Sequence, residues 1–268
     1  MSSIRAWLNP ARPAVPEPVT DARERRMVIV ELVIVFAVTL GMAGLRSLLS
    51  LIDSLLQTAA LADQKVAINV SQADTQWIDV LRQLLSAAQL IAWGALGVYL
   101  LWRAGVAPRA VGLDGRRFGR DLGGGVGLAA LIGLPGLGLY FIARAVGASL
   151  TVVPTTLDHW WQYLTLPIAA FGNAWAEEVL VVGYVITRLR QLGLRENSSL
   201  LIAAVLRGSY HLYQGFGGFV GNVVMGLVFG RVWQRTNRLW PLILAHTLID
   251  VVAFVGYALL RGVVSWLP

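Results

Sequence analysis

The chain has 268 residues, of which 56% are hydrophobic and only 14% are charged, a composition outside the usual range of soluble globular domains. It predicts an integral membrane protein. The net charge is +7, but the basic residues gather in short stretches between apolar runs, which is typical of membrane topology signals, so nucleic acid is not expected as a partner. The absence of cysteine excludes disulfides, thiolate zinc sites and cysteine nucleophiles, leaving His, Glu and Asp as candidate ligands and catalysts.

The amino-terminal segment 1–26 contains four prolines and no apolar run, so it is predicted to be a disordered cytoplasmic tail and not a signal peptide. A helical crossing needs about 20 apolar residues, and about seven later segments meet this requirement. The predicted spans are 27–45, 78–102, 122–146, 160–189, 198–214, 217–234 and 239–260. Within 46–77, Leu and Ile recur at helical spacing, which predicts an amphipathic helix at the membrane interface. The expected fold class is therefore all-α, a polytopic membrane helix bundle.

Basic residues are distributed unevenly between the two ends of these spans. The tail and the alternate connections that would share its side hold roughly three times as many Lys and Arg as the opposite connections. Because such residues are retained in the cytoplasm, we predict a cytoplasmic amino terminus and a multi-pass protein of the cell membrane. Lys65 is the only lysine among 22 basic residues, a bias that indicates a GC-rich bacterial genome.

Two adjacent acids, Glu177 and Glu178, interrupt the apolar segment 160–189. An ionisable group at the centre of a spanning helix costs roughly 2.5–3.5 kcal/mol, so such a pair is a candidate functional site. Neighbouring helical residues point about 100° apart, so one carboxylate can face the site while the other faces a neighbouring helix or a cation. The structural alternative is a buried ion pair with Arg207.

Further polar residues converge on a similar depth in later spans. At 1.5 Å per residue, Glu177, His211 and Asp250 lie roughly 16–18 Å from the cytoplasmic ends of their helices, and His246 roughly 10 Å. His246 and Asp250 are four residues apart and share a helix face, so the carboxylate can orient the imidazole, or both groups can donate to an oxyanion. A polar clasp between helices is the alternative for this pair. His211 is interpreted as a water-activating group or a metal ligand rather than a core hydrogen-bonding residue.

The order Glu-Glu, then His, then His-x-x-x-Asp in successive spans resembles the CPBP family of intramembrane proteases, which is named for CAAX proteases and bacteriocin processing and is related to type II CAAX prenyl endopeptidases. The resemblance covers 160–260, the expected protease core, and leaves the helices of 27–159 without a motif. The family motifs are Glu-Glu-x-x-x-Arg, Phe-x-x-x-His and His-x-x-x-Asn/Asp. This chain has Val182 in place of the Arg and Arg207 in place of the Phe. We hypothesise that Arg207 replaces the missing cation and pairs with Glu178.

The resemblance implies hydrolysis of a peptide bond inside the membrane. Glu177, with Glu178 beside it, and His211 would activate a water, and His246 with Asp250 would stabilise the oxyanion. This glutamate-type scheme requires no cofactor. A metallo-type scheme, with zinc held by Glu177, His211 and His246, uses the same residues and stays open. The substrate would be a membrane-associated peptide or protein, with or without a lipid. Eukaryotic relatives are expected to cleave prenylated CAAX proteins, whereas a bacterial member would process a peptide, a lipoprotein or a regulator.

Two other classes of function are considered. The departures at Val182 and Arg207 favour, as the main alternative, a catalytically inactive membrane scaffold or regulatory protein of the same fold. A transporter is the third class, because buried Glu, His and Asp also form proton relays. Against a transporter, the sequence has no internal repeat and no paired broken helices.

Overall fold

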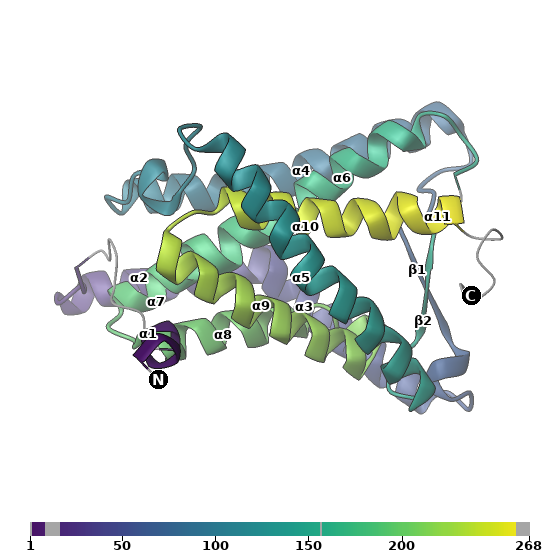
Figure 1. Ribbon diagram of the computed structural model, residues 1–268, viewed down its shortest axis with the longest axis horizontal. Helices are drawn as coiled ribbons and strands as arrows, with labels where there is room; N and C mark the ends of the chain where they lie inside the picture. Colours follow the sequence, from purple (N-terminus) through teal and green to yellow (C-terminus); the bar gives the residue numbers. More distant parts are fainter. Residues whose placement is uncertain (1, 9–16, 156, 261–268) are drawn as a thin grey trace.

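The computed structural model describes residues 2–8, 17–155 and 157–260, and most of these residues are helical (Figure 1). The α-helices are α1 (Ser2–Leu8), α2 (Ala22–Val38), α3 (Leu40–Leu56), α4 (Gln76–Arg103), α5 (Phe118–Ala145), α6 (Gln162–Glu177), α7 (Ile186–Gln191), α8 (Glu196–Ser209), α9 (Phe216–Thr236), α10 (Trp240–Val251) and α11 (Tyr257–Leu260). Two π-helical segments continue α6 and α10, namely η3 (Glu178–Val185) and η5 (Val252–Gly256). Short 3₁₀ turns are η1 (Leu61–Asp63), η2 (Pro108–Val111) and η4 (Leu212–Gln214). The predicted helical class is confirmed.

Within the described residues, five continuous helical segments are long and apolar enough to cross a membrane: α4, α5, Gln162–Gln191, α9 and Trp240–Leu260. Helices α2 and α3 pass the same test together but are bent by 51°, which gives six if this pair is one crossing. The multi-pass membrane character is therefore confirmed, whereas the predicted count of seven is not. The predicted span 198–214 accounts for the difference between seven predicted spans and the six counted when α2 and α3 form one crossing. Helix α8, which replaces it, has 14 residues and is about 21 Å long, too short for a hydrocarbon core of about 30 Å.

The amino-terminal segments differ from the sequence-based expectation. Within 1–26, α1 occupies Ser2–Leu8 and α2 begins at Ala22, while 9–16 lie outside the described residues. The amphipathic helix expected within 46–77 is α3, which begins earlier and ends at Leu56. Ser47 and Leu51 are buried on one face of α3, and this helix packs against α8 and η4. Helix α3 therefore belongs to the surroundings of the polar residues that follow α8.

A short parallel sheet stands beside the helices (Figure 1). Strand β1 (Lys65–Ile68) pairs with β2 (Thr151–Pro154), with Lys65 opposite Thr151 and Ile68 opposite Pro154. No strand is expected here from the sequence, because four residues are too few for a strand pattern to stand out among apolar runs. The sheet joins the connection after α3 to the connection before α6, and thus fixes two loops that are distant in the sequence.

The core is centred on the helix that runs through α6, η3 and α7. Every residue of η3 is buried, and α4, α8 and α9 pack around it while α10 packs against α6. Glycine permits the close approach at one crossing: a Cβ on Gly183 would lie 2.9 Å from Leu239 Cδ1. The central helix is thereby surrounded by protein rather than by lipid, so ionisable groups on it can find protein partners.

Candidate active site

Glu177 is the last residue of α6 and Glu178 is the first residue of η3, so the acidic pair stands where the α-helix widens into a π-helix. Such π segments occur frequently at functional sites. Only 3% of Glu177 and 0% of Glu178 is exposed. Buried carboxylates require charged or hydrogen-bonding partners, and both of these find the same partner on α8.

That partner is Arg207, whose side chain is fully buried. Its Nη1 donates to Glu178 Oε1 at 2.7 Å, and its Nη2 lies 3.4 Å from Glu177 Oε2. The guanidinium also lies over the ring of Phe229, 5.6 Å from its centroid. The ion pair expected between Arg207 and Glu178 is thus present, while Val182 is buried in the apolar core. Two carboxylates facing one guanidinium leave an excess negative charge, which favours a second cation nearby.

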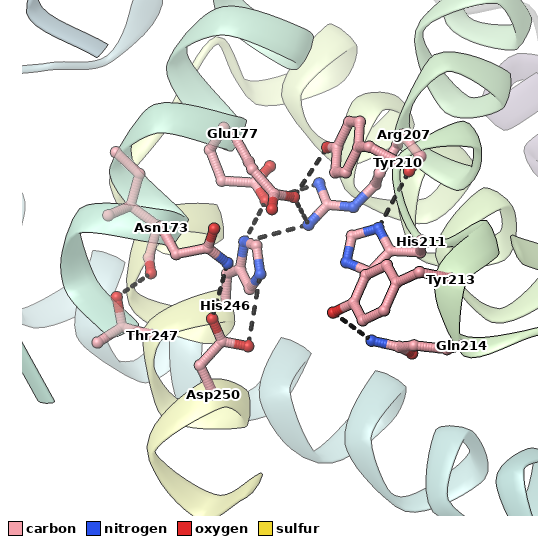
Figure 2. A network of polar contacts seen from close by, with 12 residues as sticks. Asn173, Glu177, Arg207, Tyr210, His211, Tyr213, Gln214, His246, Thr247 and Asp250 are labelled. Atoms are coloured by element: carbon pink, nitrogen blue, oxygen red, sulfur yellow. Dashed lines mark hydrogen bonds and ion pairs between the residues drawn. The ribbon is translucent and has the colours of Figure 1, made fainter. Parts of the chain in front are cut away.

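His246 on α10 is placed to act as this second cation (Figure 2). Its Nδ1 lies 2.9 Å from Glu178 Oε1 and 3.1 Å from Arg207 Nη2. A carboxylate can only accept a hydrogen bond, and a guanidinium can only donate one. We place a proton on Nδ1 because the Glu178 carboxylate is closer to it than the Arg207 guanidinium is. On the other side of the ring, Nε2 lies 3.6 Å from Asp250 Oδ1. The imidazole is therefore held between two carboxylates, an arrangement that stabilises its protonated form.

His211 lies on the turn between α8 and η4, and not within a spanning helix as the sequence predicts. Its Nδ1 lies 3.1 Å from the carbonyl oxygen of Arg207. Because a carbonyl can only accept, Nδ1 carries the hydrogen, and Nε2 keeps the lone pair. The same arginine residue thus orients His211 through its main chain and the acidic pair through its side chain.

A cavity of about 1100 Å³ adjoins this network. His211, His246 and Asp250 border it, whereas Glu177 and Glu178 lie behind them against Arg207. Most of the remaining wall is apolar; α5 contributes the largest share, and the rest comes from residues of α4, α6, α9, α10, η5, α11 and the short sheet. The structure therefore brings all the predicted site residues into one region, but in two layers: imidazoles and one carboxylate at the cavity, and the acidic pair behind.

Three residues that the sequence-based reasoning did not select complete the network (Figure 2). Asn173 Nδ2 donates to Asp250 Oδ2 at 3.0 Å, and the Tyr210 hydroxyl donates to Glu177 Oε2 at 2.8 Å. The Tyr213 hydroxyl accepts from Gln214 Nε2 at 2.9 Å and borders the cavity. A signal for Asn173 was present, because it stands four residues before Glu177 and shares its helix face.

The proposed zinc ligands do not fit a metal site in this arrangement. Across residues 2–8, 17–155 and 157–260, no three His, Asp or Glu side chains are placed to hold one ion. The Arg207 guanidinium lies between Glu177 and His246, within 3.4 Å of the first and 3.1 Å of the second. A divalent cation at that point would be repelled by the guanidinium. The positive charge of the network is already supplied by a side chain.

The chain was compared with protein-family models, curated proteins and solved structures. Residues 159–252 match the protein-family model described as type II CAAX prenyl endopeptidase Rce1-like. The matched segment runs from just before α6 to the first residue of η5 and contains the whole polar network. It confirms the resemblance seen in the motifs, and this part of the chain is similar to the CAAX-type intramembrane proteases. No curated protein and no solved structure matches the chain.

Proposed function

We propose that the protein is an intramembrane endopeptidase that hydrolyses a peptide bond of a membrane-associated substrate. One observation carries the proposal: His211, His246 and Asp250 border one cavity and are backed by a buried pair of carboxylates. Acids and imidazoles around a space of this size are the groups that peptide hydrolysis needs. The match of this segment to a protease family supports the same conclusion.

In the proposed reaction, Glu177 is the base and His211 holds the water. Among the described residues, Tyr210 and Arg207 both contact Oε2 of the Glu177 carboxylate. In this scheme Oε1 accepts one hydrogen of the water, and His211 Nε2 accepts the other. Glu177 takes a proton from this water, and the resulting hydroxide adds to the scissile carbonyl carbon. The oxyanion accepts a hydrogen bond from His246, whose protonated form is stabilised by Asp250 and Glu178. Glu177 then passes the proton it has taken to His211 Nε2, and His211 delivers that proton to the departing amine as the C–N bond breaks.

We propose further that this reaction uses no metal, because Arg207 supplies the fixed positive charge among the acidic groups. The substrate is a peptide or protein of the membrane. We propose more specifically that this substrate carries a lipid. The name of the matched family, CAAX prenyl endopeptidase, favours a prenyl group as that lipid. A scaffold role gives no reason for imidazoles to border the cavity.

The amino terminus is proposed to be cytoplasmic, on the excess of basic residues in the tail and alternate connections. Two contacts agree with this orientation, because they join the amino-terminal segment to connections that are also predicted to be cytoplasmic: Val19 N–H donates to the Gln191 carbonyl, and Arg235 Nη1 donates to the Ala6 carbonyl.

The orientation can be tested by cysteine labelling. The chain has no cysteine, so a single introduced cysteine is the only thiol that can react. Arg116→Cys should react with a membrane-impermeant maleimide only after cells are opened, whereas Lys65→Cys should react in intact cells. The reverse pattern would contradict the orientation.

The test of the function is Glu177→Gln, which keeps the size of the side chain and an acceptor for Tyr210. Membranes containing the wild type or the variant are compared by quantitative proteomics for new termini. Loss of a general base is expected to slow cleavage by about 10²–10⁴-fold. The matched control is Glu24→Gln, at an exposed position on α2. Undiminished cleavage by a folded Glu177→Gln protein would overturn the proposal.

A further inference from the structure

The cavity beside the polar network extends to the short sheet. Four consecutive residues, Ala67, Ile68, Asn69 and Val70, border it, together with Val152 of β2. Successive side chains of a strand point to opposite faces. Ala67 and Ile68 are consecutive residues of β1, so the strand meets the cavity along its edge, where the main chain is, rather than with one face only; Asn69 and Val70 continue this wall beyond the end of the strand.

The edge of β1 that faces away from β2 has no partner strand among the described residues. Thr151 N–H donates to the carbonyl of Gln64, the residue before β1, and alternation along the strand then turns the N–H and C=O of Ala67 away from β2. In the part of the chain that the structure describes, the sheet has only these two strands. The far edge of β2 differs, because Val152 N–H donates to the Tyr140 hydroxyl at 3.1 Å.

Asn69 gives a second, independent sign that a ligand with hydrogen-bonding groups belongs here. It follows β1 with a φ of 52°, a left-handed conformation that Asn tolerates better than most residues. Its Nδ2 is buried and has no hydrogen-bond partner among the described residues. A buried donor without an acceptor is unfavourable, so an acceptor at this position would stabilise the site.

We propose that an extended segment of the substrate pairs with the free edge of β1 as a third strand. Its main chain bonds to Ala67, a carbonyl near its end accepts from Asn69 Nδ2, and the segment continues along the cavity to His211 and His246. A helical substrate must unwind before its peptide bond can be cut, and its main chain would otherwise lack partners in an apolar cavity. Addition of a strand to a sheet edge supplies these partners. The inference rests on the proposed peptidase function and names how that site holds its substrate.

Pairing through the main chain predicts a selectivity that depends on position and not on side chains. On one side of the cleaved bond, N–H groups at alternate residues of the substrate face β1. Proline at those positions has no N–H and should be excluded, whereas the intervening positions should tolerate it.

The experiment uses the purified full chain in lipid nanodiscs and a proteome-derived peptide library, with the cleaved peptides identified by mass spectrometry. Ala67→Pro removes the open N–H without touching a group that faces β2, and Ala67→Ser is the matched control that keeps it. Loss of one such hydrogen bond should lower kcat/KM for the best-cleaved library peptide about tenfold in Ala67→Pro, with little change in Ala67→Ser. Asn69→Gly, which suits the positive φ, should show a similar loss.

Single N-methylation along that library peptide tests the pairing with the wild-type chain and needs no folded variant. Cleavage should fall at alternate positions on one side of the bond only. Equal tolerance at all positions, or equal rates for Ala67→Pro and Ala67→Ser, would overturn the strand pairing and leave the peptidase function standing. A wild-type chain that cleaves no library peptide would contradict the peptidase function, and the strand pairing with it.

Discussion

Two ionic clusters in this molecule have the same composition and different surroundings. Each contains one arginine and two carboxylates: Arg207 with Glu177 and Glu178 in the centre, and Arg238 with Asp114 and Asp121 at the ends of α5 and α10. The central arginine is fully buried, whereas 13% of the Arg238 side chain is exposed. The Arg238 cluster lies between spanning segments, where water and salt can compete with it.

The difference indicates which cluster is structural and which carries chemistry. The Arg238 cluster holds the start of α5 against the start of α10, and water can take the place of either partner. Water cannot replace a partner in the buried Arg207 cluster, so the free-energy cost of removing its charged groups from water is large. Well-packed apolar side chains in its place would often make the protein equally stable. Retention of charge at this depth, beside His246 and a cavity, is explained by a function that requires charge there.

The largest effect is expected from Arg207→Phe. It leaves Glu177 and Glu178 buried without their cation, and breaking one partner of a buried ion pair typically costs about 3–5 kcal/mol. We expect loss of folded protein or of cleavage, measured by the apparent melting temperature and by new termini in membranes. Addition of Val182→Arg should restore both, because it returns a cation one helical turn from Glu178.

The matched change in the other cluster, Arg238→Phe, should leave cleavage intact. If the two substitutions have equal effects on folding and cleavage, burial does not distinguish the clusters. A fully active Arg207→Phe protein would show that Arg207 does not replace the missing cation.

A smaller effect is expected from Asn173→Ala. Asn173 positions Asp250 through one hydrogen bond of 3.0 Å, and Asp250 in turn lies beside His246. Loss of this bond should lower kcat/KM about tenfold, with the melting temperature little changed. The control is Asn222→Ala, since Asn222 also borders the cavity but donates to the Gly218 carbonyl of its own helix. Partial rescue by Asn173→Gln and not by Asn173→Leu would assign the effect to the hydrogen bond. Equal loss in the Asn173→Ala and Asn222→Ala variants would instead indicate a general disturbance of the cavity wall.

The sequence predicts the members of the central cluster because each is a local anomaly. Glu177, Glu178, His246 and Asp250 interrupt apolar runs, and helix geometry gives their approximate depths. The pairing of Arg207 with Glu178 follows from two departures from the family motifs. These inferences need only sequence spacing and the cost of burying charge, and for that reason they can be made without a structure.

The rest depends on contacts between distant segments. The polar stretch 207–215 does not by itself reveal that α8 ends at Ser209 and that His211 lies on a turn, because such a stretch can also face the interior of a helix bundle, and contacts with distant segments decide between the two. The pairing of β1 with β2 is equally non-local, and so is the hydrogen bond from Tyr210 to Glu177. The change to a π-helix at Glu178 has no residue signature of its own that we can identify.

A still smaller effect is expected at the Arg238 cluster, where Arg238→Gln should cost about 1 kcal/mol at neutral pH. The pKa of Asp114 is lowered from its ordinary value of 3.8, first by the backbone N–H of Arg116 and then by Arg238. Its stabilising contribution is therefore present above pH 3.8 and is lost as the pH falls through the lower, folded-state pKa. The difference in melting temperature between the wild type and Asp114→Asn should shrink below pH 3.8. A difference that persists unchanged at lower pH would show that the Asp114 charge does not contribute.

The smallest effect is expected from removal of metal, because the central cluster already contains its cation. After dialysis against a chelator, cleavage by the purified chain should stay within about twofold of the untreated sample, and added zinc should not increase it. Arg207→Gln provides the informative contrast. With the guanidinium removed, Glu177, Glu178 and His246 lose the charge that repels a second cation, and zinc binding measured by calorimetry should appear or strengthen in this variant. Chelator-sensitive cleavage by the wild type, restored by zinc, would show that the acidic groups rearrange around a metal, and the two clusters would then differ in ligand chemistry as well as in burial.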